Sequence, residues 1–148
     1  MSHLVALDPG RSKCGLVLID REHNRVLEGK VVPPQAVMAW MNHWHEQHSL
    51  DQVIVGDGTG SAQWLQVFNS FANVQHVNER GTTLRARDRY WDLWPAKGWQ
   101  RLLPKGFRLP PNELDAIAAL VMAEDHLQQR CSWLGPPPNF SLKTWPER

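Results

Sequence analysis

Three short apolar segments at the start of the chain lie so close together that they can pair only as an antiparallel sheet. Residues 3–8, 15–20 and 26–32 each have the length and apolar content of a strand. Polar turns at residues 9–12 and 21–24 separate them, and neither turn is long enough for a helical crossover between parallel strands. This region therefore predicts a three-stranded antiparallel meander.

Beyond Pro33 the apolar residues change from strand spacing to helix spacing. The pattern predicts strands over 52–56 and 74–78 and helices that begin near residues 37, 61, 82 and 112. We expect the last three helices to be capped by Ser61, by Thr82 or Thr83, and by Asn112. The order β-β-β-α-β-α-β-α-α predicts an α/β fold, with one mixed sheet and helices on both faces. Right-handed crossovers place the later strands parallel to the first, and we expect the last strand to be its direct neighbour.

The composition is that of one globular domain with a tail. The 148 residues fit a single domain, and 42% apolar with 21% charged residues excludes a disordered chain. We expect a folded domain over residues 1–134 and an extended, Pro-rich tail over 135–148. The sequence has two cysteines without C-x-x-C spacing, and we see no long apolar run and no secretory leader. These features predict a reducing, cytoplasmic setting.

A net charge of +1 hides a local excess of positive charge. Residues 80–108 contain eight bases and two acids, interleaved with five aromatic residues. Such a segment is a candidate nucleic-acid-binding face, because bases of nucleic acid stack on aromatic rings. A solvated helix face above core tryptophans is the alternative. The bases that we assign to nucleic-acid binding in its second half are Lys97, Arg101, Lys105 and Arg108.

Three carboxylates stand at the ends of predicted elements. Asp8 ends the first strand, Glu79 follows the last strand, and Asp115 lies in the first turn of the last helix. We expect them to meet at the carboxyl edge of the sheet, where ligands of such folds bind. Converging carboxylates repel one another unless a cation neutralises their charge. Mg²⁺ or Mn²⁺ is the natural partner, because these ions prefer carboxylate oxygens. Two such ions can hold a phosphodiester between them. Each acid also has an ordinary alternative role, in a turn, at a helix dipole or in an ion pair.

Four segments, in order, resemble the YqgF-type and RuvC-type nucleases, which have a ribonuclease H-like fold. Residues 7–15 resemble their first strand and turn, and residues 55–60 their Gly-rich turn after the fourth strand. Residues 78–83 are similar to the YqgF signature in which Glu-Arg precedes a Thr-capped helix, and residues 115–119 resemble the final Asp with its Ala-rich helix. The resemblance extends over residues 4–125.

The resemblance implies a divalent-metal-dependent nuclease with Asp8, Glu79 and Asp115 as catalytic acids and metal ligands. It also implies phosphate contacts from Lys13 and Arg80. RuvC-type resolvases often carry an acid or His three residues before the helix Asp, where this chain has Asn112. This favours YqgF-like maturation of the 5′ end of pre-16S ribosomal RNA over Holliday-junction resolution. The expected partner is RNA or branched DNA rather than a membrane, and the sequence leaves the oligomeric state open, a homodimer included.

Other function classes remain open from the sequence. A non-catalytic nucleic-acid-binding module on the same fold would bind without cleaving. The spacing from Asp8 to Gly15 also resembles the phosphate loop of actin, sugar-kinase and Hsp70 ATPases. Those ATPases, however, enclose a nucleotide between two such domains. ATP binding in a thermal-shift assay would distinguish an ATPase from a nuclease. His43 and His45 are two residues apart and do not share a helix face, so we assign no metal site there.

Overall fold

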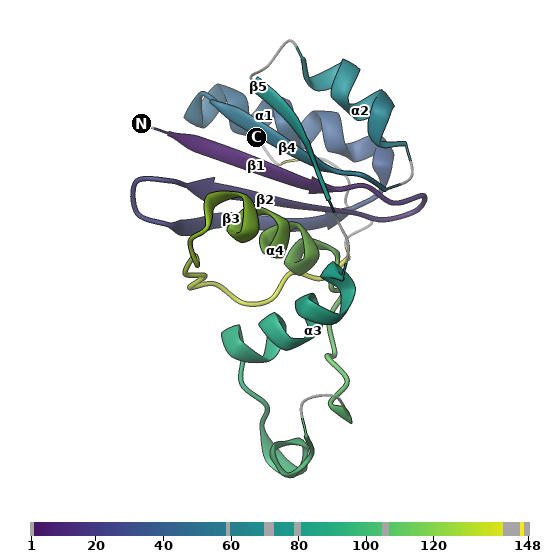
Figure 1. The fold of residues 1–148 in the computed structure, drawn as a ribbon, viewed down its shortest axis with the longest axis vertical. Coiled ribbons are helices and arrows are strands. Elements are labelled where there is room, and N and C mark those ends of the chain that lie inside the picture. Colours follow the sequence, from purple (N-terminus) through teal and green to yellow (C-terminus); the bar gives the residue numbers. More distant parts are fainter. Residues whose placement is uncertain are drawn as a thin grey trace.

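A five-stranded mixed sheet forms the centre of the protein (Figure 1). The computed structural model describes residues 2–58, 60–69, 73–78, 81–104, 107–140 and 146. The strands lie in the order β3-β2-β1-β4-β5, with β1, β2 and β3 antiparallel, β4 parallel to β1 and β5 parallel to β4. Their bounds are β1 His3–Asp8, β2 Cys14–Asp20, β3 Arg25–Val32, β4 Gln52–Gly56 and β5 Asn73–Val77. The predicted α/β class and the meander are confirmed.

The place of β5 differs from the expectation that the last strand lies beside the first. Strand β1 has two edges, and β2 and β4 occupy both of them. Strand β5 therefore pairs with the outer edge of β4. Its carboxyl end at Val77 is two strand spacings, about 10 Å, from β1.

Alternating side chains of the sheet build two cores. Val5 and Leu7 of β1 pack beneath α1 (Val37–His48), which follows the 3-10 turn η1 (Pro34–Ala36), and α2 (Ser61–Phe68) covers the same face. Leu4 and Ala6 face the other side, against α4 (Asp115–Leu127). Asp8 continues the second series, because side chains two apart point to the same face, so β1 directs Asp8 toward α4.

Helix α3 (Thr82–Leu93) forms a third layer on the outer side of α4 (Figure 1). Ala86 and Tyr90 of α3 pack on Ile117 and Ala118, so α4 is buried from the sheet side and from the α3 side. The segment after α3, which contains the 3-10 helix η2 (Gly98–Leu102), projects away from the sheet. Apart from η2, residues 95–104 and 107–111 are irregular, as the Pro and Gly content of this segment predicts.

The predicted helix caps are wrong at all three helices. Gly60 and Gly81, in the left-handed region with φ of 76° and 74°, precede α2 and α3, and no side chain caps either helix. Helix α4 begins only at Asp115, with Leu114 as its N-cap residue. The Asn112 side chain instead accepts a hydrogen bond from the Tyr90 hydroxyl and donates one to Asn139 Oδ1, so it does not cap the helix.

The Pro-rich C-terminal segment lies along the edge strand β3 as far as residue 140. Ser132 and Phe140 form isolated bridges with Arg25 and Val31. The Trp133 ring covers Gly29 so closely that a Cβ there would lie 2.3 Å from it. Residues 141–145, 147 and 148 of the expected tail lie outside the described residues. Within the described chain, no helix has the length and apolar character needed to cross a bilayer.

Candidate active site

Asp8 and Asp115 meet at the carboxyl edge of the sheet. Asp8 pairs in register with Gly15 of the neighbouring strand β2. Gly15 in turn lies against the first turn of α4, since a Cβ at Gly15 would be 2.0 Å from the Asp115 carbonyl oxygen. Both carboxylates line a pocket of about 340 Å³, which we call the acid pocket. Its other lining residues are Thr83, Ala86, Pro110, Asn112, Glu113, Leu114 and Ala118.

A Gly15→Ala substitution is expected to separate the two acids. The added methyl group must push the backbone of Asp115 and Ala116 away from β2, because those atoms are fixed by the helix. Such overpacking costs about 1–3 kcal/mol of unfolding free energy. Urea unfolding measures the loss, and Gly135→Ala, whose Cβ would meet its nearest neighbour only at 3.8 Å, is the control. Equal stability of the two variants would contradict the close approach of α4 to β2.

The electrostatics of the acid pocket disfavour uncompensated negative charge. Burial raises the pKa of the Asp115 carboxyl, and the charge of Glu113 raises it further, while Lys13 opposes the shift. The pKa of the Cys14 thiol is raised, first by burial and then by Asp8 and Asp115. Both carboxylates therefore act on the same side chain in the β1–β2 turn region. The pocket is one in which a cation would be stabilised.

Glu113 is an acid of the pocket that the sequence reasoning did not assign. Its Oε1 accepts a hydrogen bond from Lys13 Nζ at 2.7 Å, and this bond is the main cause of the raised pKa of Lys13. Lys13 also lies 5.1 Å above the Phe140 ring. Lys13, expected to contact phosphate, is thus a charged ammonium bound to Glu113, which lines the acid pocket. The signal for Glu113 was its position two residues before Asp115, in the segment that leads into α4.

Two of the expected site residues, Glu79 and Arg80, lie outside the described residues, as does Lys105. The part of their surroundings that the structure describes is the end of β5 at Val77 and the start of α3 at Thr82. Thr83 of α3 lines the acid pocket. The role of Glu79 as the third catalytic acid therefore stays a prediction.

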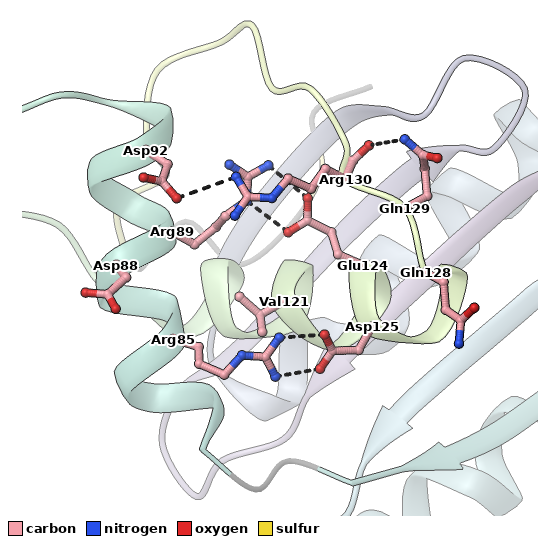
Figure 2. Close-up of a pocket in the computed structure, with 10 residues that line it drawn as sticks. All are labelled: Arg85, Asp88, Arg89, Asp92, Val121, Glu124, Asp125, Gln128, Gln129 and Arg130. Carbon is pink, nitrogen blue, oxygen red and sulfur yellow. Dashed lines mark hydrogen bonds and ion pairs between the residues drawn. The ribbon is translucent and has the colours of Figure 1, made fainter.

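The basic segment divides into paired and exposed members. Arg85 and Arg89 of α3 form two-bonded ion pairs with Asp125 and Glu124 of α4, as Figure 2 shows. Arg108 donates to three backbone carbonyls of its own loop, those of Gln100, Arg101 and Leu103.

The side chains of Lys97 and Arg101 are exposed on the projecting loop. Beside them the loop also exposes large apolar side chains, Trp99, Leu102, Phe107 and Leu109. Of the four bases assigned in this segment, Lys97 and Arg101 are therefore the described ones whose charge is accessible.

A second group of metal-donor side chains lies at the opposite end of the sheet. Asp20, Glu22 and His23 have ligand atoms within 4.8 Å of one another, and among the described residues this is the one such group of three. Asp20 ends β2 beside His3, at the opposite end of the six-residue strand β1 from Asp8. It pairs with His23 Nδ1 at 2.7 Å, and this hydrogen bond is the main cause of its lowered pKa. These contacts account for the group as an ordinary surface turn.

The sheet order and the three helical layers define a ribonuclease H-like fold. Among solved structures, the same fold occurs in Thermus thermophilus RuvC, which was determined in complex with a Holliday junction substrate. The match has a TM-score of 0.50 and 18% sequence identity, and it covers 84% of this chain and 92% of that chain. No protein-family model matches the chain, and no curated protein is similar to it in sequence. The fold expected from the resemblance is thus confirmed.

Proposed function

We propose that this protein is a divalent-metal-dependent nuclease that cleaves phosphodiester bonds in structured nucleic acid. The observation that carries the proposal is the acid pocket, in which Asp8 and Asp115 come together from the end of β1 and the start of α4. Ligands of open α/β sheets bind beyond the carboxyl ends of the strands, and the acid pocket lies there.

The residues of the acid pocket fit a hard divalent cation. Asp8 and Asp115 offer carboxylate oxygens, the donor type that Mg²⁺ and Mn²⁺ prefer, while Glu113 is held by Lys13. The raised pKa of Asp115 indicates that its own protein surroundings do not fully compensate its charge. When bound there, the ion would act as a Lewis acid on the phosphodiester and its attacking water.

The chain's own residues would orient the substrate. Asp8 is fixed by the β1–β2 ladder and Asp115 by the packing of α4, so their separation is set by rigid elements. Lys13 can exchange its bond to Glu113 for a substrate phosphate, since an exposed ammonium binds either anion.

The substrate that we favour is branched DNA. RuvC, which shares the fold over most of its length, was solved with a Holliday junction. YqgF-like processing of pre-16S ribosomal RNA is the second candidate, and it rests on the similarity of residues 78–83 to the YqgF signature. A non-catalytic binding module is the third reading, and a cleavage assay separates it from the other two.

The test is incubation of the full chain with labelled four-way junction DNA and with folded RNA, in Mg²⁺ or Mn²⁺ and then in chelator. We expect metal-dependent cleavage of the junction that chelator abolishes. Glu22→Gln, at the opposite end of the sheet, should cut at the wild-type rate because it touches only the other donor group. Cleavage of RNA alone would support the ribosomal-RNA candidate, and binding without cleavage of either substrate would contradict the nuclease proposal.

A further inference from the structure

A second pocket, rich in aromatic residues, lies between α3, the projecting loop and the C-terminal segment. Its volume is about 350 Å³, within the range of small-ligand sites. We call it the aromatic pocket. Its lining residues are Tyr90, Trp91, Trp94, Pro95, Lys97, Gln100, Pro111 and Pro137. Flat rings with a few polar groups form its wall, and no carboxylate is among these residues.

Two residues that line the aromatic pocket carry buried polar atoms without a partner among the described residues. Trp91 is only 7% exposed, and its Nε1 donates to no described acceptor. Gln100 Oε1 is shielded from solvent and accepts from no described donor. A buried polar atom without a partner costs free energy, which a ligand with a complementary edge recovers. Gln100 is half-buried, so rotation of its amide can present Oε1 to such a ligand.

The charge and shape of the aromatic pocket favour a planar, hydrogen-bonding ring attached to an anion. Trp94 is half-buried and gives a stacking surface, and the buried rings of Tyr90 and Trp91 support it, the Tyr90 centroid lying 5.0 Å from that of Trp91 and 5.2 Å from that of Trp94. Gln100 can accept from the edge of the ring. Lys97, exposed on the loop, places a cation beside it. Nucleobases combine a flat face, a donor and acceptor edge and a neighbouring phosphate.

The aromatic pocket adjoins the acid pocket. Tyr90, in the wall of the aromatic pocket, donates its hydroxyl hydrogen to Asn112 Oδ1 at 2.8 Å, and Asn112 lines the acid pocket. The consecutive residues Pro110 and Pro111 line one pocket each. A nucleotide whose base occupies the aromatic pocket would therefore have its backbone near Asp8 and Asp115.

We propose that the aromatic pocket binds one unpaired nucleobase of the nucleic acid whose backbone reaches the acid pocket. This inference rests on the proposed nuclease function and names the feature of the substrate that the protein recognises. The base stacks on Trp94 and donates to Gln100, while Lys97 pairs with an adjoining phosphate.

The experiment measures binding in chelator, so that it does not depend on cleavage. Fluorescence anisotropy compares a blunt DNA duplex with the same duplex that carries one unpaired base. We expect the wild-type protein to bind the second duplex about tenfold more tightly, because stacking of one base adds affinity of this order. Gln100→Leu should weaken binding of the unpaired-base duplex about three- to tenfold and leave binding of the blunt duplex unchanged.

Two controls separate recognition from structure. Gln63→Leu makes the same change on the exposed side of α2 and should bind both duplexes as the wild type does. Gln100→Leu should melt at or above the wild-type temperature, since it removes an unpartnered polar atom.

Lys97→Gln tests the expected phosphate contact. It should reduce the magnitude of the negative slope of log K against log salt by about 0.7–0.9.

The possible failures are distinguishable. Equal wild-type affinity for the two duplexes, or an unchanged preference in Gln100→Leu, overturns the base-binding proposal. If the protein still cleaves junction DNA, the proposed nuclease function is unaffected by this result. A preference that Gln100→Leu abolishes, in a protein that cleaves nothing, supports the aromatic pocket and overturns the proposed nuclease function.

Discussion

The Arg89→Met variant is expected to unfold at a clearly lower urea concentration than the wild-type protein. Arg89 Nε and Nη2 donate to the two carboxylate oxygens of Glu124 at 2.9 and 2.8 Å, and each of these side chains is only 10% exposed. Removal of the guanidinium leaves the Glu124 carboxylate buried without its counter-charge, which costs about 3–5 kcal/mol. The Cys131 carbonyl oxygen also loses a donor at 2.9 Å.

Arg85→Met is the matched control for this prediction. It removes the same kind of two-bonded pair one turn earlier on α3, but Arg85 and Asp125 are 51% and 48% exposed. An exposed pair is worth about 1 kcal/mol or less, so this variant should unfold close to the wild type.

The double variant Arg89→Met, Glu124→Gln should recover part of the loss, because glutamine removes the buried charge and keeps an oxygen for the Cys131 N–H. Urea midpoints at constant m-value measure all three variants. Equal losses in the two arginine variants would contradict the argument from burial.

Local pattern was sufficient to predict most of the secondary structure. The strand over residues 52–56 and the helix that begins at residue 37 occur as expected, because their apolar spacing is set by one strand or helix and its buried face. The meander follows from turn length alone, since 9–12 and 21–24 allow only hairpin connections. The fold class then follows from the order of the elements.

Interactions between distant residues could not be predicted in the same way. The positive charge of α3 is met by acids of α4 that are 40 and 35 residues away, so a count of local charge overstated how much of it is accessible. The position of β5 depends on which strand edges earlier elements have already taken. Asn112 had the spacing of a cap, yet a contact with Tyr90, 22 residues away, determines its position.

The candidate site could be predicted in part for the same reason. Asp8 and Asp115 stand at the ends of elements whose packing the pattern specifies, and the structure brings them into one pocket. Glu113 stands in an irregular segment, and only its bond to Lys13, 100 residues away, places it there. The aromatic pocket combines three separate segments, α3, the projecting loop and the C-terminal chain, and no single one of them encodes it.

The Asp115→Asn variant is expected to lose phosphodiester cleavage by about 100-fold or more while it stays folded. A bound divalent ion contributes several kcal/mol to the reaction, and about 1.4 kcal/mol corresponds to a tenfold change in rate. The amide is a neutral, weaker ligand than the carboxylate, so ion affinity falls as well. Single-turnover cleavage of junction DNA measures the rate, and Glu22→Gln is again the control. Wild-type activity in Asp115→Asn would remove this acid from the mechanism.

The same variant makes an opposite prediction for stability without divalent metal. Because burial raises the pKa of Asp115, the folded protein holds this proton more tightly than the unfolded chain, and ionisation destabilises the fold as pH rises. Asp115→Asn should therefore be more stable than the wild type at neutral pH, with the difference vanishing below about pH 3, where the carboxyl is protonated in both states. Added Mg²⁺ should reverse the order, since at 100 times its Kd a ligand adds about 2.7 kcal/mol to the protein that binds it. Thermal unfolding across pH, with Mg²⁺ and with chelator, measures both effects. Stabilisation of the variant by Mg²⁺ to the same extent as the wild type would place the ion elsewhere, with Asp20, Glu22 and His23 as the next group to test.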